Sequence, residues 1–369
     1  MFWYVILCIL MLYPLSIVYA GNISGKRTQC VALMAACLIL WFFMAMRSTE
    51  VGVDTKYYSH VFTQFSEIPF SKVFTAELYA TEEADWIFNF EYGYRLYNKL
   101  ISLFSNSPQA ITVCNSSIII VLLYYFIKKN SPVFLLSIWL YITLGIFQTE
   151  MNVTRNAIAI LIVFHAFRYV KQKRIFSYVF SCIFAAFFHK AVLVFIPVYW
   201  IIHKVEWNWK RMIGCMLFTV LVGGGCSFIS PYLSTSLPYG LGRYFTSTNS
   251  KAEAIIVGAF YLTLFLIICF FMNAKERIMI YSECKIGTTM FTLNLCCFGL
   301  SAGVGYASRI AALFGPYMII FIPELISRIE DSDKKKMVTC LAVAVCGCQY
   351  FMRLLINNIG GTLPYTFFW

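Results

Sequence analysis

Long apolar runs separated by short polar gaps extend over almost the whole chain. A helix needs about 20 apolar residues to cross a hydrocarbon core roughly 30 Å thick. We interpret the runs as twelve membrane segments, with the ranges 2–20, 30–46, 110–127, 133–149, 153–170, 175–188, 190–203, 211–229, 254–273, 287–305, 309–327 and 336–356. The pattern predicts an all-α polytopic integral membrane protein with 10–12 transmembrane helices, forming a single membrane domain over residues 1–369.

Residues 175–203 allow two interpretations, because only His189 and Lys190 interrupt the apolar run. One tilted helix would place the basic residues before and after the run on opposite sides of a membrane. Two short or re-entrant helices that turn at His189 would keep both basic clusters on the same side. We favour the hairpin, since non-helical backbone at membrane depth is tolerated where it is buried in protein or lines a cavity.

Composition and charge support membrane insertion. The chain is 60% hydrophobic, 18% aromatic and only 12% charged, whereas a soluble domain carries about 25% charged residues. The net charge of +12 comes from basic clusters in the short gaps, as the positive-inside rule predicts for cytoplasmic loops. We therefore expect no nucleic-acid partner, and this orientation puts both termini outside the cytoplasm.

One loop differs from the others in length and charge. Residues 47–109, between the second and third predicted helices, contain eight of the seventeen acidic residues and five basic ones. We predict that this loop is large, lies on the non-cytoplasmic side and forms short helices on the membrane surface. The segment 230–253, with two prolines and two glycines, is predicted to be a second external loop.

Two arginines and one histidine lie at the ends of apolar runs, where charge is costly to insert. Arg155 follows a polar turn and opens a helix, so backbone N–H groups and its guanidinium could bind phosphate together. His189 is flanked by apolar residues and could act as a general base or contact a phosphate. Arg309 follows small residues that would let backbone approach a ligand. The alternatives are interfacial arginines and a structural histidine.

The loops hold further candidates. Arg47 and Asp54 belong to the segment 47–58, Glu91 and Tyr94 to the sequence Glu-Tyr-Gly-Tyr, and Arg243 to the second external loop. Carboxylates beside aromatic rings suit sugar hydroxyls and pyranose faces, and a carboxylate can deprotonate an attacking hydroxyl. The alternative is a solvated loop with an aromatic belt.

The order of these motifs resembles a known family. Arg-x6-Asp-Thr-x-x-Tyr begins at Arg47, Glu-Tyr-Gly-Tyr follows at Glu91, and Asn-x-x-Arg ends at Arg155. Phe-Phe-His-Lys-Ala-x-Leu-x-x-x-Pro then spans residues 187–197. Together they resemble the EpsG-like branch of the Wzy polysaccharide polymerases, and the resemblance weakens after about residue 310.

The resemblance implies polymerisation of undecaprenyl-diphosphate-linked oligosaccharide repeat units into O-antigen or capsular polysaccharide, on the periplasmic face of a bacterial inner membrane. A hydroxyl of one repeat unit would attack the anomeric carbon of the growing glycan, and undecaprenyl diphosphate would leave. Arg155, Arg309 and Arg243 would stabilise the diphosphate, with Arg47 and Tyr94 as further substrate contacts. His189, Asp54 or Glu91 would accept the proton.

Two other functions remain open from the sequence. An O-antigen ligase uses the same donor, but ligases resemble one another in carrying the large loop late in the chain. A flippase or transporter of the lipid-linked unit would have short loops throughout. No metal-type cysteine spacing is present, and we predict a metal-independent glycosyltransferase without a cofactor. By analogy with the family, a chain-length regulator is an expected partner.

Overall fold

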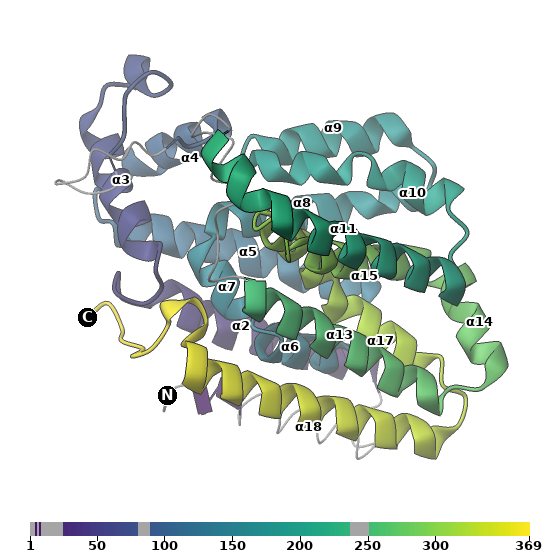
Figure 1. Ribbon diagram of the computed structural model, residues 1–369. Coiled ribbons are helices and arrows are strands. Elements are labelled where there is room, and N and C mark those ends of the chain that lie inside the picture. The colour runs from purple at the N-terminus through teal and green to yellow at the C-terminus, as the bar shows by residue number, and fades with distance from the viewer. Residues whose placement is uncertain (1–3, 6, 9–24, 80–88, 237–250) are drawn as a thin grey trace. The chain divides into compact units, whose positions relative to one another are not determined.

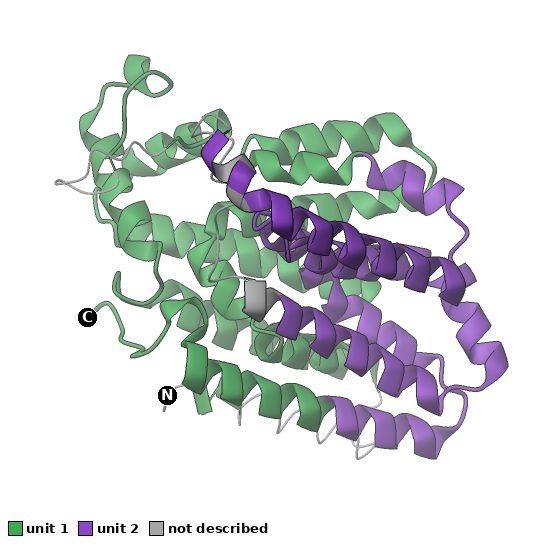
Figure 2. Ribbon diagram, viewed as in Figure 1, with its two compact units in different colours: residues 1–196, 343–369 green, residues 197–342 purple. Residues whose placement is uncertain are grey.

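The computed structural model describes residues 4, 5, 7, 8, 25–79, 89–236 and 251–369, and these residues form helices and no β-strand (Figure 1). The chain divides into two compact units, residues 1–196 with 343–369 and residues 197–342 (Figure 2). Helix α18 (Ser332–Asn357) contributes to both units. The all-α fold is confirmed for the described residues, and the single membrane domain stays a prediction.

Unit 1 is built on a row of packed helices. Its first members are α2 (Lys26–Ala45) and α5 (Gln109–Asn130), which pack against each other. Helix α5 in turn packs against α8 (Thr154–Lys171), and α8 packs against α9 (Ile175–Ala186). This row positions the start of α8, where Arg155 lies.

The described part of the chain holds fewer candidate membrane spans than the twelve predicted from the sequence. Among the described residues, five helices are long and apolar enough to cross a membrane, or six if one bent pair is counted. Helix α9 has 12 residues, about 18 Å at 1.5 Å per residue, well short of the hydrocarbon thickness. The chain is consistent with a polytopic membrane protein, but twelve spans are not confirmed. The predicted first helix, 2–20, lies largely outside the described residues.

The predicted helix 133–149 is wrong as a single straight helix. The structure has α6 (Phe134–Thr143) and α7 (Ile146–Asn152), bent by 62°. Gly145 causes the break, because its φ of +76° is a left-handed conformation that only glycine adopts readily. The apolar character of the run hides this break, since Gly145 is surrounded by apolar residues.

The hairpin interpretation of residues 175–203 is confirmed. After α9 the chain is extended at His189 and returns as the 3-10 helix η2 (Lys190–Phe195), which packs against α9. The Tyr178 hydroxyl donates a hydrogen bond to the Phe195 carbonyl at 2.8 Å, joining the two arms. His189 therefore lies at the tip of a turn. The second arm is not one α-helix over 190–203, because η2 is followed by the separate helix α10 (Val198–Lys204).

The long loop 47–109 is largely helical where it is described, as predicted. It contains α3 (Thr55–Glu67), the 3-10 helix η1 (Phe70–Lys72) and α4 (Tyr92–Ser102), with α3 packed against α4. A small core of its own holds these elements together, formed by Tyr58, Val61, Phe65, Val73, Leu78, Phe90 and Tyr94. The loop is thus a folded part of unit 1.

Two buried cations on α4 fix the loop internally. Lys99 Nζ donates to the carbonyls of Phe65 at 2.9 Å and Ile68 at 2.7 Å, where α3 ends. Arg95 Nε donates to the Val73 carbonyl at 2.7 Å, and its Nη2 donates to Ala76. Cations are favourable at a helix C-terminus because the last carbonyls lack helical partners.

We expect replacement of Lys99 by methionine to loosen α3 without unfolding the chain. The variant keeps the length of the side chain and removes both donors, a loss of about 1–3 kcal/mol. Hydrogen exchange of the α3 amides should then become roughly 5- to 150-fold faster. Lys72→Met, at an exposed position of the same loop, is the matched control. Equal exchange in both variants would contradict this role for Lys99.

Unit 2 is arranged around one central helix, α15 (Lys285–Leu300), which contacts most of the other elements of the unit. These are α10, α11 (Trp209–Ser236), α13 (Lys251–Phe271), α14 (Ala274–Glu283), α16 (Ala307–Phe314), η3 (Gly315–Tyr317) and α17 (Met318–Ser327). Two buried threonines of α15 donate within the helix, Thr289 to the Lys285 carbonyl at 2.7 Å and Thr292 to the Thr288 carbonyl at 2.8 Å, whereas Thr288 donates to the Ile280 carbonyl of α14 at 3.4 Å. Polar side chains are therefore buried without unpaired hydroxyl groups at these positions.

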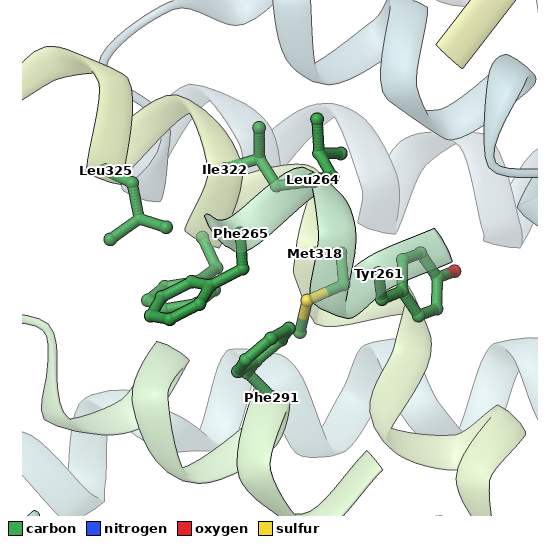
Figure 3. Close-up of a pocket in the computed structure, with 8 residues that line it drawn as sticks. Tyr261, Leu264, Phe265, Phe291, Met318, Ile322 and Leu325 are labelled. Carbon is green, nitrogen blue, oxygen red and sulfur yellow. The ribbon is translucent and has the colours of Figure 1, made fainter. Parts of the chain in front are cut away.

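Figure 3 shows a small pocket between α13, α15 and α17. Phe265 and Phe291 lie with ring centroids 4.6 Å apart. The lining consists of Tyr261, Leu264, Phe265, Phe291, Met318, Phe321, Ile322 and Leu325. Since this lining carries no charged group, we interpret the pocket as part of the apolar core of unit 2.

Two predicted gaps of unit 2 are helical. The second external loop was predicted over 230–253. In the structure α11 continues to Ser236 and α13 begins at Lys251. The middle of this predicted loop, 237–250, lies outside the described residues. The basic gap before α15 contains α14, where the Asn273 side chain accepts from the Glu276 N–H at 2.9 Å and Glu276 accepts from the Asn273 N–H at 2.7 Å. This capping box starts a helix in a segment whose charge suggested a loop.

Candidate functional site

Glu91 is the centre of a cluster of charged and aromatic side chains in unit 1. It is the residue before α4, and its side chain is only 12% exposed. One carboxylate oxygen, Oε2, accepts from Arg155 Nη1 at 2.6 Å. The other, Oε1, accepts from the Lys190 backbone N–H at 3.2 Å and lies 3.1 Å from His189 Nδ1. A single carboxylate therefore joins the start of α8 to the turn at His189.

Arg155 lies in a pocket of aromatic rings. Its Nε donates to the Tyr58 hydroxyl at 3.2 Å, and its Cζ lies 4.4 Å from the centroid of Phe90. The rings of Tyr58 and Tyr94 each lie 5.7 Å from the same carbon. Cation–π contacts of this kind favour the charged guanidinium in a partly desolvated place. Arg155 thus keeps its charge close to Glu91.

Gly93 allows α4 to approach the histidine turn. A Cβ atom at this position would lie 2.6 Å from Phe187 Cβ and 2.8 Å from the Phe187 carbonyl oxygen. That carbonyl accepts from the Tyr94 N–H at 3.0 Å. The glycine of Glu-Tyr-Gly-Tyr is therefore required by close backbone contact, which places Glu91 beside His189.

Buried hydrogen bonds from Asn115 hold two of the residues that lie next to Arg155. Asn115 Nδ2, on α5, donates to the Tyr94 hydroxyl at 2.8 Å and lies 3.2 Å from Thr154 Oγ1. Asn115, Tyr94 and Thr154 are all buried. The rotamers of the side chains next to Arg155 are thus held by polar partners from three helices.

The electrostatics of the cluster favour an ionised Glu91. Burial by itself raises the pKa of this carboxyl, but its contact with His189 and the charge of Arg155 lower the pKa below its usual value of 4.5. Burial raises the pKa of Tyr58, although the Arg155 guanidinium beside it acts in the opposite direction. At neutral pH the site therefore holds a carboxylate, a guanidinium and a neutral phenol.

A pH dependence of stability follows from Glu91. Because its pKa is lowered on folding, its stabilising effect is present above the unfolded value of 4.5 and is lost as the pH falls through the folded value. We expect the difference in Tm between wild type and Glu91→Gln to shrink as the pH falls below 4.5. A Tm difference that is the same at acid and neutral pH would contradict the ionised carboxylate.

The structure brings together four of the residues predicted from sequence, namely Glu91, Tyr94, Arg155 and His189. Asp54 lies nearby as the residue before α3, where its backbone carbonyl accepts from the Tyr58 N–H at 3.1 Å. Whether these residues act on a substrate stays a prediction at this point.

Arg47 has a different position from the cluster. It is 2% exposed, and its guanidinium donates to the backbone carbonyls of Met44 and, at 2.8 Å, Met151. These bonds join the end of α2 to the end of α7. The geometry indicates a structural cation, and the substrate contact predicted for Arg47 stays a prediction.

The remaining two arginines belong elsewhere. Arg309 lies on α16 in unit 2, with its Cζ 5.6 Å from the centroid of Tyr306. A Cβ at Gly303, six residues before Arg309, would lie 2.3 Å from the Gly223 carbonyl oxygen of α11, so the backbone at this glycine approaches another helix. The diphosphate contact predicted for Arg309 stays a prediction. Arg243 lies outside the described residues.

Three contributors to the site were not among the predicted site residues. These are Tyr58, which contacts Arg155, Phe90, whose ring lies 4.4 Å from the Arg155 Cζ, and the Lys190 N–H, which donates to Glu91. The spacing Asp-Thr-x-x-Tyr contained the signal for Tyr58, since a helix that starts after Asp54 places the residue four positions later against the core.

No group of three histidine, cysteine, aspartate or glutamate side chains that could hold a metal ion occurs in the part of the chain that the structure describes. The metal-independent reaction and the absence of a cofactor stay predictions. Within the described cluster, Glu91 Oε1 and His189 Nδ1 lie 3.1 Å apart.

The fold and the site define a helical protein with several apolar helices of membrane-spanning length and a partly buried acid–base cluster next to a cation. The chain belongs to the EpsG family, whose family model matches residues 30–367. No curated protein and no solved structure matches it. The resemblance found in the sequence is thereby confirmed, and the family associates the chain with Wzy-type polymerases and a polysaccharide-related transferase role.

Proposed function

We propose that the protein polymerises undecaprenyl-diphosphate-linked oligosaccharide repeat units by glycosyl transfer on the periplasmic face of the bacterial inner membrane. The observation that carries the proposal is the convergence of Arg155, Glu91 and His189, which come from three separate motifs of the family resemblance. One site then combines a base with a cation, the two groups that this reaction needs.

His189 is the proposed general base. Both oxygens of Glu91 are already engaged, whereas the His189 side chain is 27% exposed against 12% for Glu91. With Nδ1 directed at the carboxylate, Nε2 is the ring nitrogen left to take a proton from the acceptor hydroxyl. Glu91 would hold the imidazole and stabilise its charged form, as the carboxylate of a Ser-His-Asp triad does.

The bond changes balance without a further reactant. The acceptor oxygen forms a bond to the anomeric carbon of the growing glycan, and the bond from that carbon to the diphosphate oxygen breaks. The acceptor proton moves to His189, and undecaprenyl diphosphate leaves as an anion. A preorganised cation near the leaving oxygen lowers the energy of this transition state.

Arg155 is the proposed cation of the described site. Its Nε and Nη1 bind Tyr58 and Glu91, while Nη2 makes no hydrogen bond to any residue that the structure describes. Its side chain is 13% exposed, so the remaining donor group could meet a diphosphate. Arg309 and Arg243 are proposed as further diphosphate contacts, Asp54 and Tyr94 as sugar contacts, and a chain-length regulator as partner.

Glycan ladders in a null strain test the proposal. We expect the wild-type gene to restore a ladder, and His189→Gln, at equal protein level, to leave core capped by one repeat unit. His60→Gln, in α3 of the same unit, is the matched control and should keep the ladder. Core without any repeat in the null strain would contradict the polymerase and indicate a ligase or a flippase, and a full ladder with His189→Gln would overturn the base assignment.

A further inference from the structure

We propose that Asn152 is a positioning residue for Arg155 and that the C-terminal segment, residues 358–368, holds Asn152 in place. The proposal rests on the function proposed above as far as activity is concerned. Asn152 is the last residue of α7, three positions before Arg155, and is 7% exposed. It has no contact with Glu91 or His189, so its effect on the cluster would be indirect.

The Asn152 amide connects three segments of the chain. Its Oδ1 accepts from the Asp54 N–H at 3.3 Å. Its Nδ2 donates to the Gly360 carbonyl at 2.7 Å and to the Gln148 carbonyl at 3.1 Å. The side chain therefore needs both a donor and an acceptor, which an amide has and a carboxylate lacks.

Two glycines enclose this amide. A Cβ atom at Gly52 would lie 2.7 Å from Asn152 Oδ1, and one at Gly360 would lie 2.4 Å from Asn152 Nδ2. Both glycines have positive φ, +99° and +70°, where a side chain is also strained. The space around Asn152 thus exists only because both positions lack a side chain.

Two hydrogen bonds connect the start of α3 with the start of α8. One is the bond from the Asp54 N–H to Asn152, and the other is the bond from Arg155 to Tyr58. Asp54 precedes α3, and its carbonyl accepts from the Tyr58 N–H at 3.1 Å. Tyr58 then accepts from Arg155 Nε at 3.2 Å, on the first turn of α8. Fixing Asp54 against Asn152 therefore fixes the Tyr58 hydroxyl against the Arg155 guanidinium.

The C-terminal segment is attached to the beginning of the long loop by its backbone. Val53 N–H donates to the Gly360 carbonyl at 3.3 Å, and Gly52 N–H donates to the Gly361 carbonyl at 3.0 Å. Further along, Ser48 N–H bonds to Thr366 at 2.9 Å, and Phe368 N–H bonds to Met46 at 3.1 Å. The end of the chain thereby becomes part of the support of the site.

The first test is Asn152→Asp, which preserves shape and places an oxygen against two carbonyls. With purified protein and lipid-linked single repeats extracted from the null strain, we expect kcat to fall about 10- to 100-fold. KM should stay within roughly twofold of wild type, because the side chain does not contact the substrate. A rise in KM with unchanged kcat would contradict positioning.

Gly360→Ala and Gly361→Ala provide a matched pair. Both glycines have positive φ, +70° and +62°, but an added Cβ meets the Asn152 amide only at Gly360, and at Gly361 it meets the end of the Val53 side chain. We expect Gly360→Ala to lower kcat as Asn152→Asp does, and Gly361→Ala to have a much smaller effect. Equal effects of the two glycine variants would overturn the proposal.

A double-mutant cycle of Asn152→Asp with Tyr58→Phe distinguishes a positioning role of Asn152 from a general loss of structure. If Asn152 acts through Tyr58, the effect of Tyr58→Phe on kcat should be smaller in the Asn152→Asp background than in wild type. Additive effects would mean that Asn152 acts in another way and would overturn the proposal.

Hydrogen exchange makes the test independent of the proposed reaction. We expect amides of residues 55–58 and 155–158 to exchange faster in Asn152→Asp and Gly360→Ala than in Gly361→Ala. If wild type forms no polymer, the proposed function fails, and the exchange rates still decide the positioning. Unchanged exchange at both helix starts would overturn it.

Discussion

Replacing Glu91 with glutamine is expected to lower the rate of polymerisation by about 100- to 1000-fold. The carboxylate is the shared partner of Arg155 Nη1 and His189 Nδ1. Without its charge, the partly buried guanidinium has no counter-ion among its described contacts, and the imidazole loses the carboxylate that lies 3.1 Å from its Nδ1. A glycan ladder and a rate measured with lipid-linked single repeats report the loss.

Glu67→Gln is the matched control for this prediction, because Glu67 lies in the same loop and is exposed. It should retain the wild-type rate. A rate for Glu91→Gln within a few-fold of wild type would mean that the carboxylate serves only to fold the loop, and the acid–base role would have to be withdrawn.

Replacing Arg155 with lysine is expected to lower the rate by about 10- to 100-fold, and replacing it with alanine by about 1000-fold. Lysine keeps the charge but loses the planar fork that binds Tyr58 and Glu91 together and packs against Phe90. The difference between the two variants therefore separates the charge from its geometry. Initial rates at saturating substrate measure both.

Arg168→Ala is the control, since Arg168 lies on the same helix at an exposed position. It should leave the rate unchanged. If Arg155→Lys were as active as wild type, a point charge would suffice and the bonds to Tyr58 and Glu91 would have no part in the reaction.

The meeting of Glu91, Arg155 and His189 follows in part from the sequence. Arg155 and His189 lie at ends of apolar runs and Glu91 lies in the loop 47–109, and the basic gaps place all three on the same side of the predicted topology. The glycine of Glu-Tyr-Gly-Tyr lies against Phe187, in the same motif as His189. The predicted topology therefore placed the three residues on one side of the membrane but did not predict the contacts among them.

Other features depend on partners far away in the chain. Arg47 binds Met151, 104 residues later, so nothing near Arg47 shows that its donors are used by backbone. Tyr58 was not predicted as a site residue, because the helical register is known only once the start of α3 is fixed at Thr55. The break at Gly145 is likewise invisible in an apolar run, since it depends on a backbone angle.

The count of membrane segments shows a similar limit. Apolar composition alone treats α9 and η2 as two spans, but the structure pairs them as a short hairpin with Tyr178 bonded to Phe195. Hydropathy measures the preference for an apolar environment, and that environment can be lipid or protein. For α15 the buried threonines place it in the protein interior of unit 2.

The central claim is that this chain alone joins lipid-linked repeat units. The most direct measurement is the incubation of purified protein in lipid vesicles with lipid-linked single repeats extracted from the null strain. We predict a ladder of lengthening glycans with release of one undecaprenyl diphosphate for each bond formed, and no ladder with His189→Gln. Single repeats that remain unchanged in the presence of folded wild-type protein would contradict the claim.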